Sequence, residues 1–146
     1  EVWGYTAKPA GAPESVHMAL FPEPEELASG LDQAAMAKWD RLMELRAEVL
    51  KALEEARQAK FIGAPLEARV RLQGYEGLDD SLAELPGLFI VSQVVLDAGS
   101  EKRITIERAD GTKCERCWKY STKVGEDPEF PTVCDSCSAA LKEMLG

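Results

Sequence analysis

The chain has 146 residues and a formal net charge of −9, so it can hold one ordinary domain or two small ones. No stretch approaches the roughly eighteen apolar residues of a membrane span, and the first ten residues lack the basic and apolar parts of a secretory signal. These features predict a soluble, cytoplasmic protein without a membrane partner.

The net acidity argues against a uniformly basic surface for nucleic acid, because phosphate binding needs positive charge. The charge is unevenly distributed, however, since seven cations and four acidic residues lie between Ser100 and Lys123. A basic patch on an acidic body is one interpretation. A mixed charged surface is the commoner one.

The first thirty residues are predicted to be irregular and to wrap a surface. They contain four of the eight prolines, and proline disfavours helix in its neighbours. The single histidine, His17, lies in this acidic segment without an evident second catalytic group, so we expect a structural or surface role for it. Neither a catalytic residue nor a phosphate-binding glycine loop is predicted in the chain.

A long amphipathic helix is predicted from Leu31 to Lys60, with Asp32 as its N-cap and with Gly63 and Pro65 beyond its end. Its apolar residues recur mostly at steps of three and four: Met36, Trp39, Leu42, Met43, Leu45, Val49, Leu50, Leu53 and Ala56. Such a stripe must be buried against a partner. The remainder of a helical domain would be the natural one.

The segment after this helix favours a small mixed structure. Strands are predicted at 66–72, 87–96 and 103–108 from alternating or β-branched apolar residues, and a short helix at 79–85. The predicted fold class is therefore α+β. It comprises a long amphipathic helix, a small α/β junction domain and a C-terminal four-cysteine zinc ribbon or finger.

The zinc prediction rests on two Cys-x-x-Cys pairs, which use all four cysteines of the chain: Cys114, Cys117, Cys134 and Cys137. Each pair supplies one edge of a tetrahedron of thiolates, with zinc–sulfur bonds of about 2.3 Å. Four thiolates leave no open position for a water nucleophile, so one structural zinc is expected. Two disulfides or a redox pair are weaker alternatives, and iron would suit the same four thiolates.

Basic and aromatic residues cluster around the first cysteine pair and are candidates for nucleic-acid binding: Lys113, Arg116, Trp118, Lys119, Tyr120 and Lys123. The two aromatic side chains could stack on unpaired bases. Trp118 could equally pack over the zinc site, because so small a module has little other core. Arg116 and Lys119 could bind phosphate or simply offset the charge of the thiolates.

Several segments together resemble the C-terminal end of bacterial-type isoleucyl-tRNA synthetases. The most specific is Lys-Cys-Glu-Arg-Cys-Trp-Lys-Tyr, at 113–120, which lies within a similar segment that spans 111–125. Other similar segments follow the family order: Glu14 to His17 with Phe21 and Pro22, Leu53 to Arg57, Ile62 and Gly63, Leu66 to Ala68, Phe89 to Ser92, and Val133 to Leu141. The resemblance spans nearly the whole chain and is loosest at 72–87.

The resemblance implies three parts. Residues 1–62 would be the end of the helical anticodon-binding domain, 63–100 a junction, and 101–146 a zinc-binding domain that contacts tRNA. The implied function is to position isoleucine tRNA, held around its anticodon arm, for ATP-dependent aminoacylation by a distant catalytic domain. The rest of the synthetase chain would be the second partner.

The family's catalytic motifs, His-Ile-Gly-His and Lys-Met-Ser-Lys-Ser, do not occur in the sequence. The resemblance therefore implies an isoleucine ligase only for the whole enzyme, where ATP would bind in the catalytic domain. This chain alone is expected to be catalytically silent.

Two alternatives belong to other classes of protein. Formamidopyrimidine-type DNA glycosylases end in a zinc finger with similar cysteine spacing, which binds duplex DNA beside a flipped base. This chain does not begin with the Pro-Glu that such glycosylases use for chemistry. A zinc ribbon that contacts only protein is the other alternative, and it suits the net charge of −9.

Overall fold

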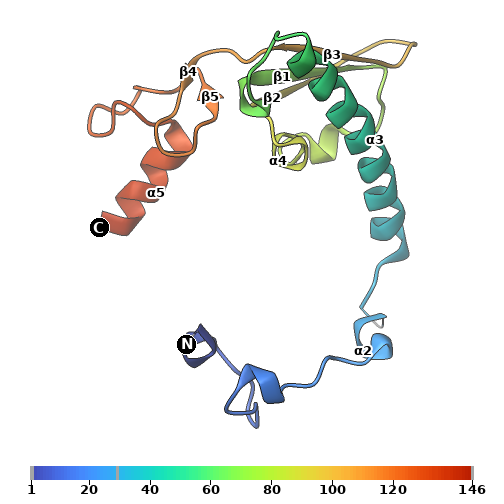
Figure 1. Cartoon of the computed structure of the whole chain (residues 1–146), viewed down its shortest axis with the longest axis vertical. Helices are drawn as coiled ribbons and strands as arrows, with labels where there is room; N and C mark the ends of the chain where they lie inside the picture. Colours follow the sequence, from blue (N-terminus) through green and yellow to red (C-terminus); the bar gives the residue numbers. More distant parts are fainter. Residues whose placement is uncertain (1, 29, 146) are drawn as a thin grey trace. The chain divides into compact units, whose positions relative to one another are not determined.

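The computed structural model describes residues 2–28 and 30–145 and divides the chain into two compact units, Glu1–Asp40 and Arg41–Gly146 (Figure 1). The first unit contains α1 (Val2–Tyr5), the 3₁₀ turn η1 (Val16–Met18), α2 (Pro24–Ala28) and the beginning of α3 (Gln33–Gln58). The second contains the rest of α3, a three-stranded sheet and the cysteine-rich end of the chain.

The described residues among the first thirty are mostly irregular, as predicted, but they contain three short helical segments that the sequence analysis did not anticipate. The prolines explain where one of them begins. Pro24 is the first residue of α2, where a missing backbone N–H leaves no hydrogen bond unmade. His17 lies exposed in η1, capped by Ser15.

Helix α3 confirms the predicted long helix and its N-cap. Asp32 Oδ1 accepts a hydrogen bond from Ala34 N at 2.9 Å, and Asp32 O accepts one from Met36 N at 3.0 Å. The helix ends before Gly63, because Lys60 adopts a left-handed φ of 58° and Phe61 N bonds back to Ala56 O. This pairing satisfies the last carbonyl groups as in a Schellman motif.

The apolar stripe of α3 is buried over only part of its length. Leu42, Leu45, Val49 and Leu53 are buried, whereas Met36, Trp39 and Met43 are 41–49% exposed. The partner of the buried stretch is the sheet rather than the helical partners expected from the sequence. All four buried residues belong to one core cluster with residues of the sheet and of α4.

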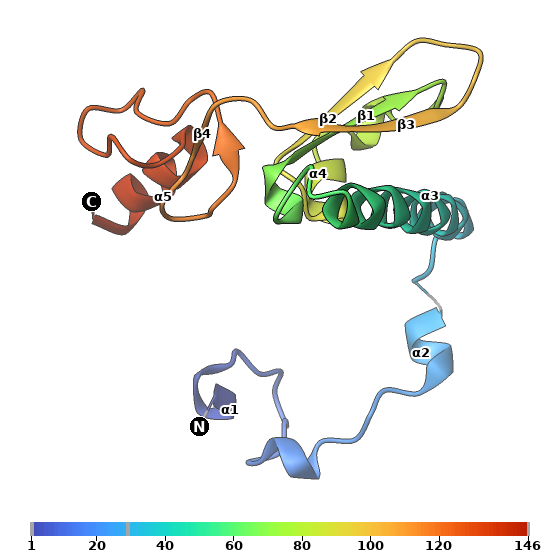
Figure 2. The same ribbon diagram turned by 45° about the horizontal axis from the view of Figure 1, so that its top comes forward.

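The three-stranded sheet has the order β2-β1-β3 and is called the junction sheet below. Its strands are β1 (Ala68–Gln73), β2 (Gln93–Asp97) and β3 (Arg103–Arg108). Strand β1 pairs in parallel with β2 and antiparallel with β3. The parallel connection needs a crossover, which is formed by the 3₁₀ turn η3 (Asp79–Ser81) and α4 (Leu85–Phe89). Figure 2 shows α3 and α4 on one face of this sheet.

The prediction of a single strand at 87–96 is wrong for its first half. Pro86 lies in the first turn of α4, where its fixed φ favours helix, and the left-handed Ile90, with φ 59°, ends the helix. Leu85 and Phe89 are fully buried from this helix. The short helix predicted at 79–85 is reduced to one 3₁₀ turn at 79–81.

The face of the junction sheet opposite the core carries a network of ion pairs. Arg69 and Arg71 on β1 share Glu107 of β3 at 2.8 and 3.0 Å. Arg71 also contacts Asp97 at 2.6 Å, and Arg69 pairs with Asp110. The two arginines are therefore already neutralised by acidic side chains of the chain itself.

Residues 112–145 form a separate small structure, called the zinc module below. It consists of the hairpin β4 (Thr112–Lys113) and β5 (Tyr120–Ser121), followed by α5 (Asp135–Leu145). The α+β fold class is thereby confirmed. The three-part division at 62/63 and 100/101 stays a proposal, and β3 lies in the same sheet as β1. Among the described residues, no helix is long and apolar enough to cross a membrane.

Candidate metal centre and nucleic-acid interface

The four cysteines converge on one site. Their sulfur atoms all lie within 4.8 Å of one another, and none of the four is in a disulfide. Cys117 Sγ lies 3.8 Å from Cys134 Sγ, which matches the edge, about 3.8 Å, of a tetrahedron with zinc–sulfur bonds of about 2.3 Å. The donor set therefore fits one four-coordinate zinc, whose role would be to hold the two cysteine pairs together.

A tight backbone turn presents the first pair. Cys114 N donates to Lys119 O, and Trp118 N donates to Cys114 O, both at 2.9 Å. The turn closes because Trp118 adopts a left-handed φ of 67°. Gly111 precedes this turn with φ +89°, and a Cβ atom there would collide with the carbonyl group of Ser121. Only glycine fits that position of the hairpin.

Backbone N–H groups prepare the buried sulfur of Cys114 for metal binding. Burial opposes ionisation, but hydrogen bonds from the N–H groups of Cys117, Cys134 and Arg116, together with one from the Cys117 side chain, lower the pKa of Cys114 to about 6. Arg116 Nη1 lies 3.7 Å from Cys137 Sγ and adds positive charge. Zinc binds thiolates, so these donors favour the ligand form.

The second pair lies at the beginning of α5. Cys134 N donates to Cys114 Sγ at 3.3 Å, which links the two pairs directly. Cys134 O accepts a hydrogen bond from Ser138 N at 2.9 Å and so belongs to the first turn of the helix. Burial raises the pKa of the Cys134 thiol. Metal coordination must therefore supply the energy that keeps this sulfur ionised.

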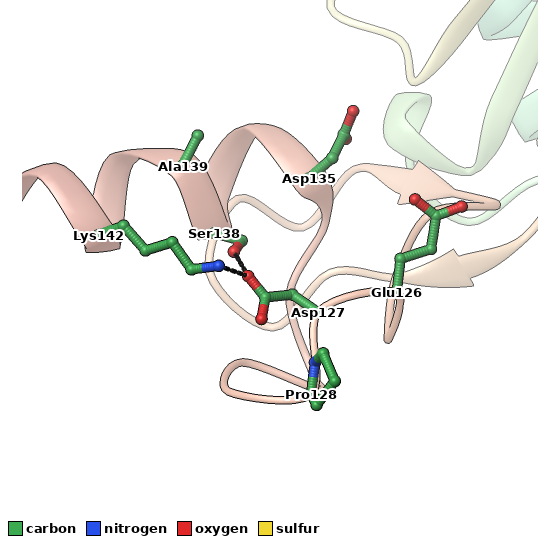
Figure 3. A pocket seen from close by; sticks show the side chains of 7 residues that line it. All are labelled: Glu126, Asp127, Pro128, Asp135, Ser138, Ala139 and Lys142. Atoms are coloured by element: carbon green, nitrogen blue, oxygen red, sulfur yellow. Dashed lines mark hydrogen bonds and ion pairs between the residues drawn. The ribbon is translucent and has the colours of Figure 1, made fainter.

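An ion-pair clamp attaches the loop between the cysteine pairs to α5 (Figure 3). Asp127 accepts hydrogen bonds from Ser138 Oγ and from Lys142 Nζ, the latter at 2.5 Å. Lys142 and Ser138 lower the pKa of Asp127 to about 2. These residues line an open hollow of about 460 Å³ together with Glu126, Pro128, Asp135 and Ala139. Asp127, Ser138 and Lys142 therefore have a structural role at this hollow.

The hydrophobic support of the metal centre is small and was missed by the sequence analysis. Val133 is buried beside three of the cysteines, and Val124, Phe130 and Leu141 pack against them. Leu141 follows Cys137 by four residues on α5, a helical spacing that could have identified it. Phe130 and Val124 lie in irregular chain, where no periodicity marks a core residue.

The structure separates the six candidate nucleic-acid-binding residues into groups. Lys113, Arg116, Trp118 and Lys119 lie around the first cysteine pair, and the three cations are exposed. Trp118 is 62% exposed, with Lys113 Nζ 5.3 Å from its ring centroid, so it does not cover the zinc site. Tyr120 is half-buried in β5. Lys123 is paired with Asp135 at 2.9 Å, so its charge is partly used within the module.

Comparison with known proteins places this metal centre in a described class. Residues 111–140 match the model of a zinc finger found in FPG and IleRS. Over 99% of its length, the chain is 39% identical to the isoleucine–tRNA ligase of Desulfitobacterium hafniense, and over 97% it is 42% identical to that of Geobacter sulfurreducens. The chain matches the C-terminal part of isoleucine–tRNA ligases.

The similarity to isoleucine–tRNA ligases covers nearly the whole of this chain but only a small part of each ligase. The chain spans 17% of the length of each of these two ligases. The matched zinc-finger model and the four-cysteine cluster agree on one structural zinc. The comparison also favours the ligases over the DNA glycosylases, because the ligase similarity includes α3 and the junction sheet as well as the zinc module.

Proposed function

We propose that this chain is a tRNA-binding part of an isoleucine–tRNA ligase, with Cys114, Cys117, Cys134 and Cys137 as its zinc ligands. The observation that carries the proposal is the similarity to these ligases over 97–99% of the chain. In the whole enzyme, the chain would help to hold isoleucine tRNA around its anticodon arm. The acceptor end of the tRNA would thereby be positioned at a distant catalytic domain that binds ATP.

The exposed surface around the first cysteine pair is the best candidate for the RNA contact. Among the described residues, Lys113, Arg116 and Lys119 have no carboxylate within ion-pair distance. Trp118 offers an exposed ring beside them. Cations and aromatic faces together suit a single-stranded loop, whose bases can stack while its phosphates are neutralised.

The junction sheet is a poorer candidate for phosphate binding although it also carries arginines. Arg69 and Arg71 are held by Glu107, Asp97 and Asp110, so binding a phosphate would require breaking existing ion pairs. This contrast supports the zinc module as the tRNA-facing surface. Residues 101–146 are accordingly proposed as the tRNA-interacting domain, after a junction at 63–100 and the end of the anticodon-binding domain at 1–62.

The chain itself is proposed to be catalytically silent. It lacks the two signature motifs of the family, and the four-cysteine cluster, which is the one metal-binding cluster among the described residues, leaves no coordination position for a reacting water. Isoleucine-dependent exchange of pyrophosphate into ATP should therefore be undetectable with this chain. Exchange above that of a mock purification would contradict the proposal.

Fluorescence anisotropy tests the proposed partner directly. The zinc-loaded chain is titrated into labelled isoleucine tRNA, a scrambled RNA of the same length and a DNA duplex with an oxidised base. Preferential binding of the tRNA is expected. Preference for the duplex would favour the glycosylase alternative, and binding of none of the three would favour a protein-interaction module.

Matched variants then locate the surface. Arg116→Ala with Lys119→Ala should weaken tRNA binding and flatten the log–log salt dependence by about 0.7 to 0.9 for each phosphate that is no longer neutralised. The control is Lys51→Ala with Lys60→Ala, which removes the same two positive charges from α3 and from the residues just after it. If the α3 pair has the larger effect while zinc stays bound in both variants, the RNA surface lies on α3 instead.

A further inference from the structure

Two adjacent polar residues at the beginning of β2 bond to the zinc module and to the connection that precedes it. Ser92 immediately precedes β2, and its Oγ donates to Leu66 O at 2.5 Å and accepts from Tyr120 N at 2.7 Å. Gln93 begins β2 and bonds twice to the backbone of Asp110: its Nε2 donates to Asp110 O at 3.0 Å, and its Oε1 accepts from Asp110 N at 2.9 Å. These four hydrogen bonds are called the Ser92–Gln93 staple below.

The staple links parts of the chain that are far apart in sequence, and it adds to the ion pair between Arg69 and Asp110 in the connection after β3. The zinc module follows β3, whereas β2 lies at the opposite edge of the junction sheet. Tyr120 and Ser92 are 28 residues apart, and Asp110 and Gln93 are 17 apart. The staple therefore ties the connection after β3, and the hairpin beyond it, to the beginning of the far strand.

Apolar packing does not replace this link. The core of the zinc module and the core under the junction sheet form two separate clusters with no residue in common among those described. Hydrogen bonds are directional, and several of them acting at two points fix an orientation as well as a distance. The exposed cationic side of the module is thereby held at a defined angle to the sheet.

We propose that Ser92 and Gln93 are positioning residues that fix the zinc module on the junction sheet and so orient its cationic surface toward tRNA. The orientation itself follows from the contacts of this chain. Its consequence for tRNA rests on the function proposed above. A surface already held in its binding orientation gives up less conformational freedom on association, so binding is tighter.

Residual dipolar couplings and amide exchange in the zinc-loaded chain test the orientation. In the parent, couplings from the junction sheet and from the zinc module should fit one alignment tensor. Ser92→Ala and Gln93→Ala should require two tensors, and Ser92→Ala should speed exchange of the Tyr120 amide at least about threefold, as expected when one hydrogen bond is removed. Ser92→Thr keeps the hydroxyl group and should restore a single tensor.

Two exposed positions provide matched controls. Ser100 lies in the loop before β3, and Ser100→Ala is the first control. Gln58→Ala is the second, because the Gln58 side chain bonds to Glu54 within α3. Neither should alter the alignment. Gln93→Ala is the variant that should still fold. The two hydrogen bonds of Gln93 are exposed, so their removal leaves no buried polar group without a partner. A single tensor in both staple variants, with zinc retained, would overturn the proposal.

Steady-state aminoacylation by a ligase containing this chain tests the consequence. Ser92→Ala and Gln93→Ala should raise KM for tRNA about three- to tenfold with kcat and tRNA-independent pyrophosphate exchange unchanged. If the staple variants reorient the module but KM does not move while Arg116→Ala with Lys119→Ala raises it, the orientation set by the staple does not serve tRNA binding, and that part of the proposal is wrong. If neither set moves KM, the function proposed for the module fails, whereas the orientation result stands.

Discussion

The junction sheet and the zinc module solve the same problem of stability by different means. Eleven buried apolar residues from α3, α4, the sheet and their connections form one core cluster. Among the residues of the zinc module whose burial is described, only four are buried in its core, and three of them are cysteines. A segment of this size cannot bury enough apolar surface to offset its conformational entropy, so a metal replaces the missing core. The two regions should therefore fail under different treatments.

Loss of one zinc ligand should produce the largest effect, and only in the zinc module. Zinc binding contributes on the order of 10 kcal/mol or more to the folding of small finger peptides, so Cys134→Ser should unfold residues 112–145. Amide signals of the module should collapse to random-coil positions while those of the junction sheet remain. Ser136→Ala, between the two cysteines of the pair, should change neither. If the amide signals of the zinc module stayed dispersed without zinc, the module would not depend on the metal for its fold, and the two regions would not differ in this respect.

A cavity under the junction sheet should give the reverse result. Leu72 on β1 is fully buried, and Leu→Ala at such sites costs about 2 to 5 kcal/mol. Leu72→Ala should lower the free energy of unfolding of the sheet in urea, with zinc content unchanged. Leu82 is 37% exposed, so Leu82→Ala makes the same chemical change at a surface position. It should lower the free energy of unfolding far less. Zinc loss by Leu72→Ala would mean that the two regions fold as one cooperative unit.

Removal of Trp118 should separate stability from binding within the zinc module. Because this ring is 62% exposed, Trp118→Ala should leave zinc content and thermal unfolding close to those of the parent. A ring that stacks on a base should instead contribute about 1 to 3 kcal/mol to RNA binding. Trp118→Phe should retain most of that affinity. Loss of zinc in the alanine variant would show that the indole has a structural role after all.

The ion pairs on the open face of the junction sheet should have the smallest effect, and it should depend on pH. Hydrogen bonds from Arg71 and Arg69 lower the pKa of Glu107 from its ordinary value of 4.5. A depressed pKa in the folded state stabilises the fold above the unfolded value, and this stabilisation is lost as the pH falls through the folded value.

Glu107→Gln should therefore lose about 0.5 to 1 kcal/mol of stability near pH 7, and the difference from the parent should shrink below about pH 4.5. Urea unfolding of the sheet at several pH values measures both quantities. Glu76→Gln, at an exposed position in the connection after β1, supplies the comparison. A difference that grows with acidity would mean that Glu107 is not held by the two arginines.

The sequence predicted the parts of the structure in which one local signal dominates. Helix α3 was predicted from the three- and four-residue spacing of its apolar residues and from Asp32 as its N-cap. Strand β3 was predicted from the alternation of apolar and polar residues around Ile104 and Ile106. The cysteine spacing likewise predicted the convergence of the four sulfurs. These features depend on short-range geometry that the order of residues expresses directly.

The prediction failed where a backbone conformation or a distant contact decides. At 87–90, the apolar residues suggested a strand, yet Pro86 and the left-handed Ile90 produce a helix. The burial of α3 joins it to residues of the sheet and of α4 that lie farther along the chain, which no local pattern shows. The Ser92–Gln93 staple joins residues far apart in sequence and could not have been inferred from either end.

The steric restriction at Gly111 has a consequence for how related chains can diverge. A side chain there would collide with the carbonyl group of Ser121 and would also have to adopt a φ of +89°. The neighbouring Asp110 is bonded to Gln93 through both its backbone N–H and its carbonyl group, so a residue inserted at 109–112 would misalign the hairpin and the staple together. Length differences among such domains should instead fall outside 109–112. An insertion near Pro128 and Glu129 would have to preserve the Asp127 clamp and the packing of Phe130 against the cysteines.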